Sequence, residues 1–170
     1  LYKARERGII FDVGHGGGSF CWRNAIPSIE QGFYPDSIST DLHTSCMNDE
    51  MQDMTNVMSK FLAIGLPLQE IVKESTTNPA NEIGHPELGH LSVGAVADVT
   101  ALSIYEGDFA FLDVHGGRLP AKQRLRCELT LLDGKVMWDW NGRTGVDWQE
   151  LPKLYGVRNP EGLIMPPESL

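Results

Sequence analysis

Two short apolar segments separated by one helix-forming stretch constrain the fold of this chain most strongly. Residues 8–14 form a nearly continuous apolar run, which is typical of a strand buried on both faces of a parallel sheet. Residues 22–31 favour a helix that ends at Gly32, although Pro27 weakens this prediction. Residues 36–41 favour a second short strand, and a strand–helix–strand order predicts parallel pairing.

Helical periodicity dominates the next segment. Apolar side chains recur at helical spacing from Met54 to Ile64, which predicts an amphipathic helix closed by Gly65. Pro67 suits the first turn of another helix. A short third helix is predicted from Thr77, and it stops at Gly84.

From about residue 90 the pattern changes to strands. Asp133-Gly134 is a hairpin signal of the type I′ turn, and it separates two strand candidates. The predicted strands are residues 97–104, 109–114, 125–132 and 136–140. They indicate a small antiparallel β unit.

Composition narrows the classes of function. The net charge of −9 disfavours a nucleic-acid partner, since binding the phosphate backbone needs clustered Lys and Arg. No apolar run approaches the roughly 18 residues that span a bilayer, so no membrane partner is expected. The three cysteines form no C-x-x-C pair, which favours a reducing, cytoplasmic setting. The chain begins at Leu1 rather than Met, so we expect further residues upstream.

Polar side chains follow both predicted parallel strands. His15 ends the first strand and precedes three glycines, whereas Asp41 ends the second and precedes His43. Ligands bind at the carboxyl ends of parallel strands, where a carboxylate and an imidazole can hold a metal or move protons. The plainer alternative is that Asp41 caps a turn and His15 is a turn residue. Spacing alone leaves both open.

The remaining histidines and the cysteines offer little evidence for a catalytic site. His85, His90 and His115 are predicted loop residues, and each cysteine lacks a neighbouring His that would suggest a nucleophile pair. The sequence contains no H-x-H, H-E-x-x-H, G-x-S-x-G or P-loop pattern.

Motifs in the second half resemble a known family. Asn-Pro-Ala-Asn-Glu-Ile-Gly at residues 78–84 is followed by Gly-His-Leu-Ser-Val-Gly-Ala-Val-Ala-Asp-Val at 89–99. This combination resembles the segment that leaves the barrel in the amidohydrolase superfamily. Leu-Asp-Gly-Lys-Val at 132–136 resembles the hairpin that follows in the small β domain of that family.

Three upstream motifs resemble the same superfamily, and the last two of them match its deacetylase-like, dihydroorotase-related branch most strongly. Ser-Thr-Asp-Leu-His at 39–43 is similar to the end of barrel strand eight. Phe-Asp-Val-Gly-His-Gly at 11–16 is similar to strand seven, and Met-Ser-Lys-Phe-Leu at 58–62 to the helix after strand eight.

The resemblance implies an α/β fold in three parts. Residues 1–87 would be the last β/α units of a TIM-like (β/α)8 barrel, and residues 88–143 strands of a small β-sandwich domain. Residues 144–170 would form an extended tail. A whole barrel needs about 250 residues, so most of it lies outside this chain.

The resemblance also implies site residues. Asp41 would bind metal and act as general base, while His15, Gly16 and His43 would lie at the substrate, with Cys46 in a substrate-side wall spanning residues 44–53. The implied cofactor is a divalent metal, zinc, as one or two ions. Its other ligands would be an H-x-H after strand one, a carboxylated Lys after strand four and His residues after strands five and six. The chain lacks those positions.

The implied function is hydrolysis of an amide or ester bond in a small acylated substrate, such as an N-acyl amino acid. Asp41 would accept a proton from the metal-activated water and pass it to the leaving group. This chain alone is expected to be inactive. The alternative is a truncated, non-catalytic paralogue that acts as a binding or scaffold protein, or as half of a split barrel. Exposed strand edges then favour a homo-oligomer or pairing with the missing N-terminal barrel part.

Overall fold

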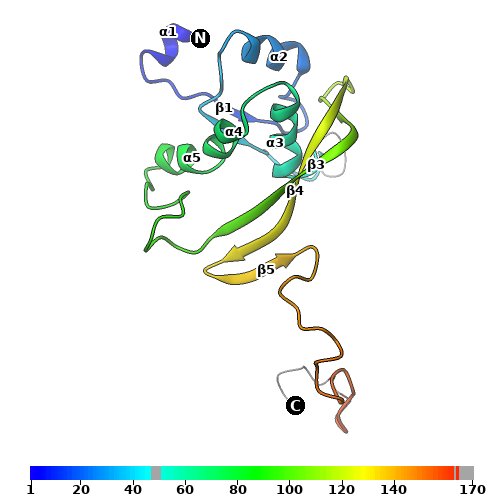
Figure 1. Ribbon diagram of the computed structural model, residues 1–170. Coiled ribbons are helices and arrows are strands. Elements are labelled where there is room, and N and C mark those ends of the chain that lie inside the picture. Colours follow the sequence, from blue (N-terminus) through cyan, green and yellow to red (C-terminus); the bar gives the residue numbers. More distant parts are fainter. Residues whose placement is uncertain (47–50, 163, 165–170) are drawn as a thin grey trace. The chain divides into compact units, whose positions relative to one another are not determined.

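The computed structural model describes residues 1–46, 51–162 and 164 (Figure 1). It divides into two compact units, Leu1–Trp138 and Asp139–Leu170. The helices are α1 (Tyr2–Arg5), α2 (Trp22–Glu30), α3 (Met54–Ala63), α4 (Leu68–Glu74) and α5 (Thr77–Glu82), and the strands are β1 (Asp12–Gly14), β2 (Ser37–Ser39), β3 (Val99–Leu112), β4 (Arg118–Leu132) and β5 (Lys135–Asp139). Each described helix falls short of the length or hydropathy that a bilayer crossing requires.

The predicted strand–helix–strand unit is confirmed. β1 and β2 pair in parallel, with Asp12 opposite Ser37 and Gly14 opposite Ser39. α2 makes the crossover between them, and Pro27 lies inside this helix without ending it. β1 is shorter than the apolar run that predicted it. Ile9 and Ile10 are about half exposed, so an apolar run at this position does not indicate burial.

α3 is the helix that covers one face of this small sheet. It begins at Met54, as predicted, because the carboxylate of Asp53 accepts a hydrogen bond from the backbone N–H of Asn56 at 2.6 Å. Val57 and Phe61 lie on its buried side and belong to the same core as Ile38 of β2. The helical periodicity therefore identified the face that packs on the sheet.

α4 and α5 follow as short helices. Pro67 precedes the first turn of α4, and Ile71 on that helix is fully buried. α5 ends at Glu82, just before the predicted stop at Gly84, where φ is +77°. The two predicted helices are confirmed.

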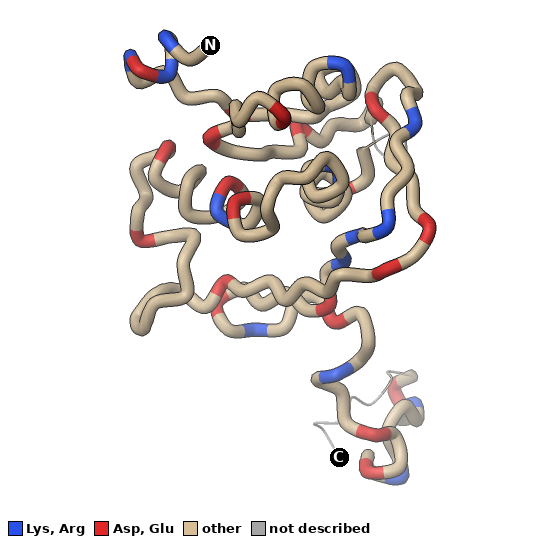
Figure 2. Tube along the Cα trace, turned by 45° about the horizontal axis from the view of Figure 1, so that its top comes forward, with Lys and Arg blue, Asp and Glu red and all other residues tan. Residues whose placement is uncertain are grey.

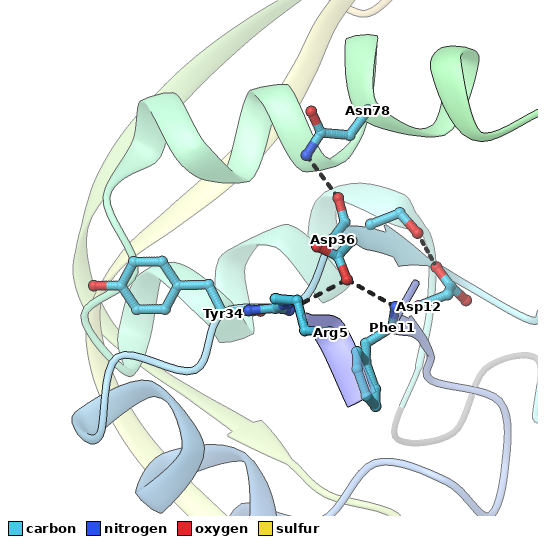
Figure 3. A network of polar contacts seen from close by, with 7 residues as sticks. Arg5, Phe11, Asp12, Tyr34, Asp36 and Asn78 are labelled. Atoms are coloured by element: carbon cyan, nitrogen blue, oxygen red, sulfur yellow. Dashed lines mark hydrogen bonds and ion pairs between the residues drawn. The ribbon is translucent and has the colours of Figure 1, made fainter. Parts of the chain in front are cut away.

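A polar network fastens α1 and α5 to the start of β2 (Figure 3). The carboxylate of Asp36 accepts hydrogen bonds from the backbone N–H of Phe11 at 2.8 Å and from Arg5 at 3.2 Å. Arg5 also donates to the carbonyl of Tyr34. From α5, the amide of Asn78 donates to the carbonyl of Asp36 at 2.7 Å. This network sets where β2 enters the sheet.

The antiparallel unit is a long hairpin of β3 and β4, joined on one side by β5. Two predicted strands, 97–104 and 109–114, form a single strand in the structure. A register shift between Glu106 and Phe109 accommodates the break in alternation. The predicted turn at Asp133-Gly134 is confirmed, with positive φ at both residues.

The hairpin and the parallel unit share one core. Figure 1 shows the hairpin running past α3, and the backbone N–H of Leu125 donates to the hydroxyl of Ser59 at 2.9 Å. Phe111 and Leu125 from the hairpin pack in the same buried cluster as Phe20. The proposed boundaries at residues 87 and 143 therefore stay predictions, since this core crosses the first of them.

β4 gathers several cations along one stretch (Figure 2). Lys122 contacts the carboxylate of Asp108, and the guanidinium of Arg126 stacks over Tyr105 at 4.9 Å from the ring centroid. Arg124 donates to the side chain of Gln52 at 2.8 Å. These cations contact groups of the same chain, and the expectation of no nucleic-acid partner stays a prediction.

The second unit is built from turns. The carboxylate of Asp139 accepts hydrogen bonds from the backbone N–H and the hydroxyl of Thr144, at 2.7 and 2.8 Å. Arg158 forms an isolated antiparallel bridge with Ile164 and donates to the carbonyl of Gly162 at 3.0 Å. Such local hydrogen bonds organise a segment with little hydrophobic periodicity.

Candidate active site

The candidate site lies where the chain leaves the two parallel strands. The pairing of β1 and β2 continues beyond their ends, because the N–H of His15 reaches the carbonyl of Ser39 at 3.3 Å and the N–H of Gly16 reaches that of Thr40 at 2.9 Å. The loop after β1 is thereby held beside Asp41, the residue after Thr40. The structure brings together the predicted residues on the two strands.

Gly16 and Asp41 form a close contact that only glycine permits. Gly16 has φ of +47°, and a Cβ atom built on it would lie 2.7 Å from Oδ2 of Asp41. Asp41 itself has φ of +48°, a conformation that Asp tolerates better than most residues. The exposed Asp41 carboxylate therefore stands directly over the Gly16 backbone.

The loop after Asp41 folds back against the glycines. A Cβ atom on Gly17 would lie 3.3 Å from Cβ of Cys46 and 3.7 Å from Cε1 of His43. The exposed imidazole of His43 contacts the hydroxyl of Ser45 through Nδ1 at 2.7 Å. His43 thus lies on the same open side as Asp41.

Cys46 is fully buried and shapes the loop from within. Its Sγ accepts a hydrogen bond from the N–H of His43 and donates to the carbonyl of the same residue, both at 3.3 Å. The predicted substrate-side wall continues through residues 47–50, which lie outside the described residues. Whether Cys46 borders a substrate stays a prediction.

His15 has no exposed surface. Its Nδ1 lies 2.8 Å from the carbonyl oxygen of Gly16, and its Nε2 lies 2.6 Å from Nζ of Lys60. The ring stacks on Phe20, with centroids 4.8 Å apart. Burial lowers the pKa of His15, and the charge of Lys60 acts in the same direction, while the hydrogen bond to Gly16 opposes both. The imidazole is therefore neutral at neutral pH.

Lys60 is a residue that sequence reasoning missed. It lies on α3 and is fully buried. Lys60 follows Val57 at i+3 and precedes Phe61, so it interrupts the apolar stripe of the helix. A lysine in such a stripe is seldom fully buried without a role, and this was the available signal.

Asp12 is a second residue that was missed. Its two carboxylate oxygens accept hydrogen bonds from the hydroxyls of Ser37 and Ser39 on β2, at 2.8 and 2.7 Å. A Cβ atom on Gly14 would lie 3.4 Å from Cβ of Asp41 and 3.6 Å from Oδ2 of Asp12. Asp12 and Asp41 therefore share one face of the sheet, separated by the missing side chain of Gly14.

This arrangement contains one oxygen donor for the predicted metal, the carboxylate of Asp41. The Asp41 carboxylate is exposed beside backbone that approaches it closely, which suits an oxygen ligand of a divalent ion. Among the described residues, no three His, Cys, Asp or Glu side chains come together as a complete ligand set. The metal-binding role of Asp41 therefore stays a prediction.

A cavity and three further histidines complete the features near and around this site. A cavity of about 200 Å³ opens between β1 and α2, and apolar side chains such as Val13, Ile29 and Phe33 line it. The three histidines predicted to lie in loops do so: His85, His90 and His115. Asp12 and Phe20 also line the cavity, so it adjoins the candidate site although it contains none of the residues predicted from the sequence.

Asp113 is a buried carboxylate that accepts hydrogen bonds from backbone N–H groups. It accepts hydrogen bonds from the backbone N–H groups of Trp22, His115 and Gly117, at 3.1, 3.0 and 2.7 Å. Burial alone would raise the pKa of Asp113, but these three donors outweigh burial and lower it. Asp113 therefore caps α2 from the hairpin tip.

Comparison with known proteins adds a family context. No protein-family model matches the chain. A deacetylase of Brucella anthropi is 40% identical over 120 residues, which is 68% of this chain and 30% of that protein. The chain spans about a third of the length of the curated relatives it matches.

Two solved structures resemble the fold closely. A crystal structure of an adenine deaminase matches with a TM-score of 0.77 and 29% identity, covering 81% of this chain and 38% of that one. A crystal structure of a dihydroorotase matches with a TM-score of 0.74 and 33% identity over the same shares.

Proposed function

The chain belongs to the amidohydrolase superfamily, of which it matches a C-terminal part; from this premise we propose that it carries part of the active site of a metal-dependent hydrolase acting on C–N bonds. The substrate is a small acylated compound, such as an N-acyl amino acid, and the bond that is cleaved is an amide or an ester. The parallel unit supplies the last two β/α units of a (β/α)8 barrel, and the hairpin supplies strands of the β-sandwich beside it. The metal is zinc.

The position of Asp41 is the observation that carries this proposal. Asp41 follows a parallel strand at its carboxyl end, the edge where α/β enzymes place their chemistry. Its carboxylate is exposed on a face that also holds Asp12, while the opposite face is packed by α3. The loop conformation at Gly16 leaves room for no side chain other than that of Asp41.

A divalent metal, held in part by Asp41, would polarise the substrate carbonyl when bound and would lower the pKa of water toward about 7. Asp41 takes a proton from the attacking water and delivers it to the departing nitrogen. Its carboxylate can do this because it is exposed, and the Gly16 backbone beside it carries no side chain that would cover it. His43, exposed on the same side, can donate a hydrogen bond to substrate.

Asp41→Asn in the protein as purified tests this role. We expect kcat/KM for N-acetylated amino acids to fall by roughly 10²–10⁴-fold, since the amide cannot accept the proton. Bound zinc, measured by mass spectrometry of the metal, should also decrease. Asp108→Asn is the matched control, because this carboxylate on β3 is 89% exposed and far from the loop in sequence. Turnover that survives Asp41→Asn would show the assigned role to be wrong.

A second candidate function is a non-catalytic scaffold or one half of a split barrel. The half-exposed Ile9 and Ile10 beside β1 favour it, because apolar side chains at a sheet edge invite a partner chain. The intact mass of the protein from its native source separates the two candidates. A mass near 18.8 kDa with no bound zinc would favour the scaffold, whereas a mass larger by about 20 kDa or more would favour the hydrolase.

A further inference from the structure

A buried cation contacts the loop after β1, which lies beside Asp41. Lys60 on α3 and His15 after β1 are both fully buried, and Nζ of Lys60 lies 2.6 Å from Nε2 of His15. A buried lysine is costly unless it is hydrogen bonded. The contact joins the helix on the packed side of the sheet to the loop that follows β1.

The surroundings of His15 define its tautomer. Nδ1 faces the carbonyl oxygen of Gly16 at 2.8 Å, and a carbonyl can only accept a hydrogen bond. With Lys60 in place, Nδ1 therefore carries the proton. In the neutral ring this leaves a lone pair on Nε2, and the ammonium of Lys60 donates to it.

The hydrogen bond from His15 acts on the residue beneath Asp41. It holds the carbonyl of Gly16, while the N–H of Gly16 donates to Thr40 at 2.9 Å. Both ends of Gly16 are thus restrained in its left-handed conformation. This conformation places the backbone where a Cβ atom would meet Oδ2 of Asp41 at 2.7 Å.

We propose that Lys60 is a positioning residue for Asp41, which it aligns by holding His15 in the Nδ1–H tautomer that restrains Gly16. The catalytic consequence rests on the function proposed for Asp41, whereas the positioning itself rests on contacts within this chain. In this role the buried His15 needs no contact with substrate.

Lys60→Met in the protein as purified is the first test, because Met keeps the length of the side chain and removes the ammonium. Lys73→Met on α4 is the matched control, since that exposed lysine makes only a surface ion pair with Glu70 at 3.5 Å in the described contacts. The readouts are the ¹⁵N shifts of the His15 ring, the amide resonances of Gly16 and Asp41, and steady-state kinetics.

In Lys60→Met we expect the His15 ring to populate both neutral tautomers and the Gly16 and Asp41 amides to shift. We expect kcat to fall by roughly 10–100-fold, as for other residues that orient a metal ligand, while KM changes little. Lys73→Met should leave every readout at the wild-type value. Unchanged ring shifts and amides in folded Lys60→Met overturn the proposal.

His15→Asn and His15→Ala give the same test should Lys60→Met fail to fold. The Asn amide can replace Nδ1–H as donor to Gly16, so His15→Asn should retain the Gly16 amide position and more activity than His15→Ala. Equal behaviour of the two variants overturns the proposal. A wild-type protein that hydrolyses no acylated substrate defeats the proposed function alone, because the NMR readouts still decide whether Lys60 restrains Gly16.

Discussion

The two faces of the small parallel sheet differ although the same six residues of β1 and β2 form both. One face carries Ile38, which packs against α3, and leads to the buried His15. The other carries Asp12 and Ser39 and leads to the exposed Asp41. Because side chains alternate along a strand, adjacent residues serve opposite tasks. Reactive groups gather on the open face, and the groups that hold them in place gather on the packed face.

Paired substitutions on β2 offer the sharpest test of this difference. Ile38→Ala should lower the free energy of unfolding by about 2–5 kcal/mol, because it leaves a cavity in the packed face. Ser39→Ala removes a hydrogen bond to Asp12 and should cost about 0.5–1.5 kcal/mol. Urea titrations of both variants measure these values. Equal losses would mean that the open face is packed as tightly as the other.

A carboxyl group behind the packed face sharpens the comparison through pH. Burial, followed by the charge of Glu70, raises the pKa of Glu74 to about 7. The folded protein therefore binds a proton that the unfolded chain releases near pH 4.5. The stability that Glu74 contributes is fully present below about pH 4.5 and is lost as pH rises through about 7. The total loss in the free energy of unfolding is about 3 kcal/mol.

Glu74→Gln should remove that dependence, because the amide mimics the protonated acid. We expect the variant to exceed the wild type in stability at pH 8 and to match it near pH 4. Glu30→Gln on α2, where the side chain is exposed, serves as control and should follow the wild-type curve. Stability curves against pH that run parallel for wild type and Glu74→Gln would contradict the burial argument.

Adding a methyl group to Gly16 tests whether the close approach of its backbone to Asp41 requires glycine. Gly16→Ala places a side chain at φ of +47° against the Asp41 carboxylate, so stability should fall by about 1–2 kcal/mol. Zinc content and kcat/KM should fall as well if Asp41 acts as proposed. Gly18→Ala is the control, because open space surrounds that position, and thermal melts of both variants provide the measurement.

Local features of the sequence were sufficient for several elements. The spacing of Val57 and Phe61 located α3, and the pair Asp133-Gly134 located the turn between β4 and β5. The order of strand, helix and strand predicted the parallel pairing that brings His15 and Asp41 to one edge. These signals work because helix period, turn conformation and crossover topology depend on neighbours in the chain.

Features that depend on residues far apart in the chain could not be predicted from the sequence. The bond from Trp22 to Asp113 joins positions 91 residues apart, and the pair of His15 and Lys60 joins positions 45 residues apart. The register shift that merges two predicted strands into β3 depends on its pairing with β4. In each case the partner is chosen by packing, which leaves no local period in the sequence.

The sequence by itself determined which residues follow the parallel strands, and so which side chains meet at their carboxyl edge. Only the tertiary structure decided that Asp41 is exposed while His15 is buried against Lys60. The physical reason is that a residue at the end of a strand can project to either side of the sheet. The packing of α3 on one side closes that side to solvent, and the left-handed backbone at Gly16 and Asp41 directs the carboxylate to the other.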